Sequence, residues 1–180
     1  MVAATKVEMV VTPPKPVLRD YAATDRDRLL AHFSVTWSAT HEPEFVKWSL
    51  CNAAAPPDPV NRMSGDDGRM IVADLHGDII GSAGYRSADQ VSYIMGMYIH
   101  PDWQRQGLGA EMLVEALRHL PVDRNVLVYA MASSTWAVAF YEKQGFKRFE
   151  QSDPEFGNGH FPCIGLFLHH SRLVCIDGGR

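Results

Sequence analysis

The most informative stretch of the chain is residues 97–110, MYIHPDWQRQGLGA, where a strand pattern ends, a short loop follows and an amphipathic helix begins. The first amides of a helix have no partner within it, and the helix dipole favours an anion at that end. Gly107 and Gly109 lack the side chains that would hold a phosphate away, and Arg105 adds a positive charge at the rim. The spacing therefore predicts a site for a phosphate or pyrophosphate.

Two common nucleotide-binding patterns do not fit this stretch. In the dinucleotide pattern GxGxxG, Met112 stands where the third glycine belongs, and the pattern GxxxxGK[ST] does not occur in the chain. A nicotinamide cofactor and ATP are therefore disfavoured as the bound phosphate compound.

Two separate motifs resemble those of the GNAT superfamily of acyl-CoA-dependent N-acyltransferases. Residues 104–109, QRQGLG, match the family pattern Gln/Arg-x-x-Gly-x-Gly/Ala. Residues 134–146, STWAVAFYEKQGF, match the pattern Asn-x-x-Ala-x-x-Phe-Tyr-x-x-x-Gly-Phe, except that Ser134 replaces the asparagine. The resemblance spans roughly residues 70–167 and implies the fold of that family, with acetyl-CoA as the acyl donor.

The resemblance also implies where acetyl-CoA binds. It places the donor between the strand that ends at Ile99 and the strand of residues 126–130. Serine at position 134 still caps a helix but lacks the amide that would contact the pantetheine arm. The implied donor-binding residues are Tyr98, Ile99, Gln104, Arg105, Gln106, Gly107, Leu108, Gly109, Ala110, Ser134, Ala137 and Tyr141.

The chemistry implied by the resemblance is direct transfer in a ternary complex. A neutral amine attacks the thioester, the carbonyl oxygen gathers negative charge, and coenzyme A leaves as a thiolate that must be protonated. A backbone N–H around Met97 would polarise the carbonyl, and Tyr141 occupies the usual general-acid position. The alternative for Tyr141 is a core tyrosine, because the same helix packs Phe140.

No general base stands out. The strand pattern of residues 90–100 contains neither Glu nor Asp, so water or a remote side chain would take the proton. His100, Tyr93 and Asp74 are the candidate side chains. Cys163 is disfavoured as an acyl-carrying nucleophile, because it lies in the apolar run FPCIGLFL and is expected to pack there.

The acceptor would bind, by the same resemblance, between the first two helices and the loop that joins the last two strands. Both segments are acidic and aromatic, which suits a cationic amine with an apolar portion. The alternative is that they are ordinary solvated loops. The candidate acceptor-binding residues are Trp37, Glu42, Glu44, Phe45 and Phe156, with Asp153 and Glu155 as further carboxylates.

The periodicity of the chain predicts the elements that position these residues. Thr24 and Asp27 resemble a capping box that opens a first helix, a second helix is expected after Thr40, and Gly145 is expected to end the last one. The fold class is α+β, with a mixed central sheet that is split between two strands where a helix crosses over, and with helices on its flanks. We expect strands over residues 16–19, 70–75, 79–86, 90–100, 126–130, 146–151 and 161–169, helices over residues 108–120 and 135–144, and a surface loop over residues 53–68.

Composition and length exclude several other classes of protein. The 180 residues suit one domain, which we place at residues 16–180 after a flexible arm of residues 1–15. A net charge of -4 disfavours nucleic acid as a partner. The chain has three cysteines without a CxxC spacing, so we expect no disulfide framework. His169 and His170 are adjacent but have no third ligand at a suitable spacing, so we expect no metal site. No segment has the pattern of a signal peptide or a membrane span, so we expect a cytoplasmic protein.

Together these features predict an N-acetyltransferase that acts on a primary amine of a small molecule. The expected partners are acetyl-CoA and that amine, with neither nucleic acid nor membrane, and the choice between monomer and homodimer is left open. A protein or peptide amine is the nearest alternative acceptor. A catalytically idle acyl-CoA-binding or interaction module is the alternative from another class.

Overall fold

The computed structural model describes residues 14–41, 43–54, 60, 67–152, 155–156, 159–160 and 162–173. The first half of the chain forms β1 (Val17–Asp20), α1 (Arg26–Ser38), α2 (Pro43–Ala54), β2 (Arg69–Leu75), β3 (Asp78–Ser87) and β4 (Val91–Ile99). The second half forms α4 (Leu108–Arg118), β5 (Asn125–Met131), α5 (Thr135–Lys143), β6 (Lys147–Ser152), β7 (Glu155–Phe156), β8 (Gly159–His160) and β9 (Cys163–Leu168). No helix in this part of the chain is long and apolar enough to cross a membrane.

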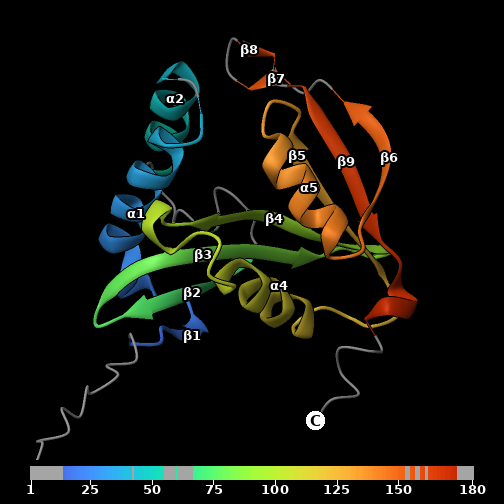
Figure 1. Cartoon of the computed structure of the whole chain (residues 1–180), viewed down its shortest axis with the longest axis horizontal. Helices are drawn as coiled ribbons and strands as arrows, with labels where there is room; N and C mark the ends of the chain where they lie inside the picture. The colour runs from blue at the N-terminus through green and yellow to red at the C-terminus, as the bar shows by residue number, and fades with distance from the viewer. Residues whose placement is uncertain are drawn as a thin grey trace, which may run out of the picture.

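Seven strands form one mixed sheet in the order β1-β2-β3-β4-β5-β9-β6, and β7 with β8 forms a small separate hairpin. All neighbours in the large sheet are antiparallel except β4 and β5, which are parallel. A parallel pair needs a long crossover, and α4 supplies it. The expected split of the sheet at a helical crossover is therefore confirmed (Figure 1).

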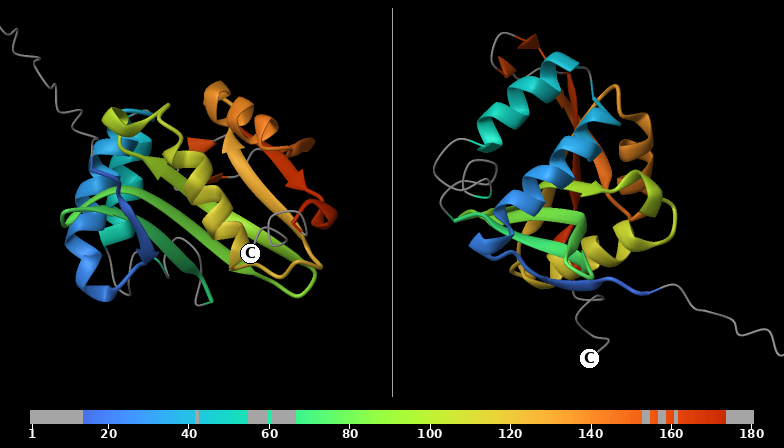
Figure 2. Two further views of the ribbon diagram at one scale, coloured as in Figure 1. Left: turned by 60° about the horizontal axis from the view of Figure 1, so that its bottom comes forward. Right: turned by 90° about the vertical axis from the view of Figure 1, so that its left-hand side faces the viewer.

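Helices cover both faces of the sheet because its central strands are apolar on both sides. Along β2, Ile71 and Ala73 belong to the core under α4 and α5, whereas Met70 and Val72 belong to a second core under α1. Two views show α1 and α2 grouped at one end of the sheet and α4 and α5 along its other face (Figure 2). At the β5–β9–β6 end, Tyr129 and Phe149 are each 44% exposed, so the described helices leave that part of the sheet partly open.

The first helix begins differently from the sequence-based expectation. The turn Ala23–Asp25 precedes α1, and the Asp25 carboxylate, not a Thr24 hydroxyl, closes it by accepting the Ala22 amide at 2.9 Å. Asp25 is 1% exposed and is held by the guanidinium groups of Arg19 and Arg28. The expected capping box of Thr24 and Asp27 is wrong because this ion cluster fixes the turn.

Other boundaries follow the sequence closely. The apolar stripe of α4 is buried, and Gly145 ends α5 with a φ of 94°, as its position predicts. The last strand, expected over residues 161–169, is shorter in the structure, where β9 covers Cys163–Leu168.

Candidate active site

The β4 and β5 strands separate halfway along their length and leave a cleft between them. They pair from Val91 with Asn125 to Ile94 with Val128, and no further pair follows (Figure 1). The register of β3 with β4 shifts between Gly84 and Tyr85, which leaves Met95 as an extra residue on β4. Such a bulge bends its strand and increases the local twist. The bulge therefore lies where the two strands part.

The separation turns two β4 amides towards the cleft. The His100 backbone N–H donates to Ile80 O at 2.8 Å, so the peptide groups of every second β4 residue, counted back from His100, point towards β3. The peptide groups of Met97 and Ile99 therefore point away from β3. The Ile99 carbonyl agrees with this direction, because it accepts a hydrogen bond from the Gln104 side chain at 3.1 Å. The Met97 N–H thus faces the side that β5 has left.

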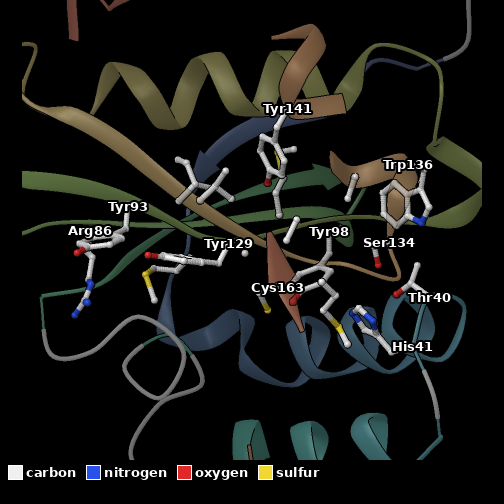
Figure 3. Close-up of a pocket in the computed structure, with 18 of the residues that line it drawn as sticks. Thr40, His41, Arg86, Tyr93, Tyr98, Tyr129, Ser134, Trp136, Tyr141 and Cys163 are labelled. Carbon is white, nitrogen blue, oxygen red and sulfur yellow. The ribbon is translucent and has the colours of Figure 1, made fainter. Parts of the chain in front are cut away.

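A cavity of about 580 Å³ occupies this cleft. Its walls come from β4, β5, the start of α5 and the connection between α1 and α2 (Figure 3). The lining residues with polar or aromatic side chains are Thr40, His41, Arg86, Tyr93, Tyr98, Tyr129, Ser134, Trp136, Tyr141, Glu150 and Cys163.

The start of α4 lies directly after the loop that follows β4. Gly107 is its N-cap with a φ of 92°, and Arg105 also has a positive φ of 59°. The Ala110 amide already donates to Gly107 O at 3.0 Å, so the amides ahead of it, those of Leu108 and Gly109, are the ones available to an anion. Of the expected donor-binding residues, Ala110 is thus already engaged, and the Leu108 side chain is buried in the core.

The two loop glutamines hold the loop itself. Gln104 donates to Ile99 O as described, and Gln106 donates to Asp102 O at 2.7 Å. A Cβ at Gly107 would meet nothing within 4 Å, whereas one at Gly109 would lie 3.7 Å from Ile99 and Phe140. Glycine is needed at position 107 for its backbone conformation rather than for space.

Tyr141 points from α5 towards the cavity (Figure 3). Its ring makes edge contacts with Phe140 and Phe146 and is 5% exposed, so it is both a core residue and a lining residue. Burial raises the pKa of the Tyr141 hydroxyl above its ordinary value. The hydroxyl is therefore protonated at neutral pH, as a proton donor must be.

Ser134 occupies the N-cap position of α5 but does not cap it with its side chain. The residue is 6% exposed and lines the cavity close to Ala137, another expected donor-binding residue. The expected capping role is wrong, because the hydroxyl lies at the cavity wall rather than over the first helical amides.

One end of the cavity carries charged and phenolic groups that the sequence did not indicate. Arg86 on β3 lies over the ring of Tyr93 at 4.9 Å from its centroid, and the Tyr129 hydroxyl donates to Glu150 at 2.5 Å. The hydrogen bond to Glu150 raises the pKa of Tyr129 to about 12. Arg86, Tyr129 and Glu150 come from three strands, so only the register of the sheet brings them together.

His41 lines the cavity at the opposite end, next to Thr40 (Figure 3). Burial lowers the pKa of His41 below its ordinary value, so its imidazole is neutral at pH 7. His41 lies within the segment that the sequence indicates for acceptor binding, residues 37–45. Its position next to the carboxylates Glu42 and Glu44 was the feature of the sequence that could have identified it as a candidate. Of the three base candidates, only Tyr93 lines the cavity. Asp74 is instead bound by Arg19 at 2.6 Å at the other end of the molecule.

The expected acceptor-binding residues are placed only in part. Trp37 is 3% exposed and stacks on Phe33 in the second core, so its side chain does not line the cavity. It packs there because it follows Phe33 by one helical turn on the buried face of α1. Glu42 and Asp153 lie outside the described residues, as do the side chains of Glu44, Phe45, Glu155 and Phe156.

Other expected or excluded groups have these positions. His100 accepts the Asp102 amide at 3.3 Å after the end of β4. Cys163 is buried at the start of β9 and lines the cavity, while Cys51 is exposed. Within the part of the chain that the structure describes, no three His, Cys, Asp or Glu residues are grouped as metal ligands.

Comparison with known proteins agrees with this geometry. A family model described as an acetyltransferase (GNAT) domain matches residues 66–148, and no curated protein sequence matches the chain. A GCN5-related N-acetyltransferase from Rhodopseudomonas palustris is similar with a TM-score of 0.70 and 21% identity, over 90% of this chain and 99% of that one.

Two further solved structures share the fold. The PaiA N-acetyltransferase from Thermoplasma acidophilum, solved in complex with coenzyme A, has a TM-score of 0.63 and 17% identity, over 82% of this chain and 96% of that one. The ribosomal-protein-S18-alanine N-acetyltransferase from Escherichia coli has a TM-score of 0.61 and 18% identity, over 84% of this chain and 92% of that one. Residues 66–148 therefore match the acetyltransferase (GNAT) domain model, and the chain shares the fold of these acetyltransferases.

Proposed function

We propose that this protein is an N-acetyltransferase that moves the acetyl group of acetyl-CoA directly to a primary amine of a small molecule. The observation that carries the proposal is the parting of β4 and β5 after Ile94 and Val128, because it opens a lined cavity beside unpaired backbone amides. The GNAT family match and the shared fold support the same reaction class.

The described residues fit an acyl-CoA donor in two places. The amides of Leu108 and Gly109 at the start of α4 suit a pyrophosphate, and the exposed Arg105 adds a positive charge beside them. The cleft edge of β4, with the peptide groups of Met97 and Ile99, suits an extended amide-containing arm. The bound donor supplies an electrophilic thioester carbon and a thiolate leaving group.

Met97 serves as the carbonyl-polarising group in this proposal. Its N–H faces the cleft and is fixed by the sheet, so it needs no reorganisation when negative charge develops on an acyl oxygen. A hydrogen-bond donor preorganised in this way is worth more than one in water, because the site is partly closed to solvent.

Tyr141 is the proposed proton donor to the departing thiolate. It lines the cavity from α5, and its raised pKa keeps the proton on the hydroxyl until a strongly basic group lies beside it. The packing of its ring against Phe140 and Phe146 would hold the hydroxyl in one place.

His41 is the proposed acceptor of the proton that the attacking amine loses. Its imidazole lines the cavity and is neutral at pH 7, so it is able to take a proton at that pH. The described part of β4 offers no carboxylate for this task, in agreement with its sequence, VSYIMGMYI.

The proposal is tested by the release of free thiol from acetyl-CoA with a panel of amines, and by identification of the acetylated product. The panel holds aliphatic monoamines, diamines, amino acids and short peptides with a free N-terminus. The proposal expects thiol release and N-acetylated product with at least one small amine. Tight acetyl-CoA binding without thiol release for any amine would favour an idle acyl-CoA-binding module, and release with peptides alone would favour a peptide acetyltransferase.

A further inference from the structure

Arg86 projects into the active-site cavity from the end of β3. Neighbouring side chains on a strand point to opposite faces, and the preceding residue, Tyr85, stacks on His119, the C-cap of α4, with ring centroids 5.5 Å apart. Arg86 is therefore on the face away from α4, directly opposite Tyr93 on β4. The close-up shows Arg86 and Tyr93 together at one end of the cavity (Figure 3).

The guanidinium of Arg86 is held in position but is not neutralised. The Tyr93 ring lies 4.9 Å away, which favours a cation but carries no charge. The Arg86 Nε is buried and has no hydrogen-bond partner in the described part of the chain. Other arginines are engaged differently, since Arg19 binds Asp25 and Asp74, and Arg124 donates to Ser87.

Arg86 forms no ion pair with a carboxylate of the described residues. Glu150 is the only carboxylate among the described lining residues of the active-site cavity, and it accepts the Tyr129 hydroxyl at 2.5 Å, while Asp67 lines a second cavity, of about 490 Å³, that Arg86 also reaches. A partly buried cation without an anionic partner loses hydration and gains little in return, so it favours an anion from outside. Guanidinium also matches the planar, paired oxygens of a carboxylate or phosphate.

We propose that the acceptor carries, besides its amine, an anionic group that binds Arg86. This inference rests on the proposed acetyltransferase function and narrows its substrate class to amino-carboxylates or amino-phosphates. The reacting end of the cavity is marked by Met97 and the anionic end by Tyr93, four residues earlier on the same strand. Four residues of strand span about 13 Å, so the acceptor is elongated, with the amine and the anion at its two ends.

The test compares three long amines of similar shape and one short amine as acceptors, with acetyl-CoA and the full chain. The amines are ω-aminodecanoate, ω-aminodecyl phosphate and uncharged ω-aminodecanamide, which span about 13 Å when extended, and, as the short control, glycine. We expect kcat/KM for at least one of the two long anionic amines to exceed that for the amide about tenfold or more, because a hydrogen bond to a charged group contributes about 1.5–3 kcal/mol. The preferred anion distinguishes a carboxylate from a phosphate, and glycine should be poor because it cannot span the cavity.

Two matched variants locate the effect. Arg86→Gln should reduce the ratio of anionic to uncharged acceptor by about tenfold or more. Arg118→Gln is the control, because Arg118 lies on α4 beside Glu115 and lines neither the active-site cavity nor the second one, which Arg86 also reaches. A ratio that does not fall in Arg86→Gln, a ratio that falls equally in Arg118→Gln, or no anionic preference in the unmodified protein would overturn the proposal.

A binding measurement separates this inference from the proposed reaction. Calorimetric titration of ω-aminodecanoate and ω-aminodecanamide, with coenzyme A present, reports binding without any transfer. Preferred binding of the anion that Arg86→Gln abolishes supports the Arg86 site even if no thiol is released. Equal binding of both amines refutes it even if the enzyme is active.

Discussion

Replacement of the two glycines at the start of α4 by alanine is expected to act in opposite directions. Gly107 has a φ of 92° and would have no neighbour within 4 Å of an added Cβ, so Gly107→Ala costs only backbone strain, about 1–2 kcal/mol. Gly109 lies inside the helix, where an added Cβ would be in ordinary contact with Ile99 and Phe140 at 3.7 Å. Gly109→Ala should therefore be neutral or stabilise by up to about 1 kcal/mol.

The two variants form a matched pair, since each adds one methyl group to the same helix start. For a chain of this length, Gly107→Ala should lower Tm by roughly 2–8 °C, and Gly109→Ala should leave it unchanged or raise it slightly. Thermal unfolding by circular dichroism measures both. Acetyl-CoA affinity, measured by calorimetry, should fall in Gly107→Ala, because relief of the strain moves the Leu108 amide.

Two outcomes for these variants would contradict the role given to the left-handed N-cap at Gly107. If Gly107→Ala unfolds at the temperature of the unmodified chain and binds acetyl-CoA equally well, the left-handed N-cap is not required. If Gly109→Ala is the destabilised variant, close packing rather than backbone conformation governs this loop.

Three further substitutions test the proton transfers and the ion cluster. Tyr141→Phe keeps the ring contacts and should reduce kcat about 10²-fold or more at unchanged Tm, whereas unchanged turnover at saturating substrate would make Tyr141 a core residue only. His41→Gln should lower kcat/KM at neutral pH and remove an acidic limb below about pH 6.5 in the profile of the unmodified enzyme; a limb that persists in the variant would belong to another group. Hydrogen bonding to Arg19 lowers the pKa of Asp25 from 3.8 to about 2, so the stability it contributes is present above about pH 4 and is lost as pH falls towards 2. Asp25→Asn should cost about 2–4 kcal/mol in urea unfolding at pH 7 and much less near pH 2, and an equal cost at both would refute the linkage.

The fold follows largely from local patterns in the sequence. The apolar stripe of α4, the left-handed glycine after α5 and the apolar strands between residues 70 and 100 are each set by neighbours within a few positions. The position of β9 between β5 and β6 is not local, because it depends on how strands more than 30 residues apart share one core.

The candidate site divides in the same way. The donor end could be predicted because its residues lie in one continuous stretch around Gly107 and in one helix around Tyr141. The far end could not, because Arg86, Tyr129 and Glu150 meet only through the registers of three strands. Trp37 misled the prediction, since an aromatic residue close to an acidic segment is as suitable for a core as for a ligand, and its spacing from Phe33 favours the core.

The central claim is that acetyl-CoA binds in the cleft between β4 and β5 and at the start of α4. Amide chemical shifts measured by NMR during titration with acetyl-CoA test it most directly. The account predicts the largest changes at the amides of Met97, Leu108 and Gly109, with little change at Ile71 in the buried β2 strand. Changes confined to the second cavity around Arg69 and His119, with the β4 and α4 amides unmoved, would contradict it.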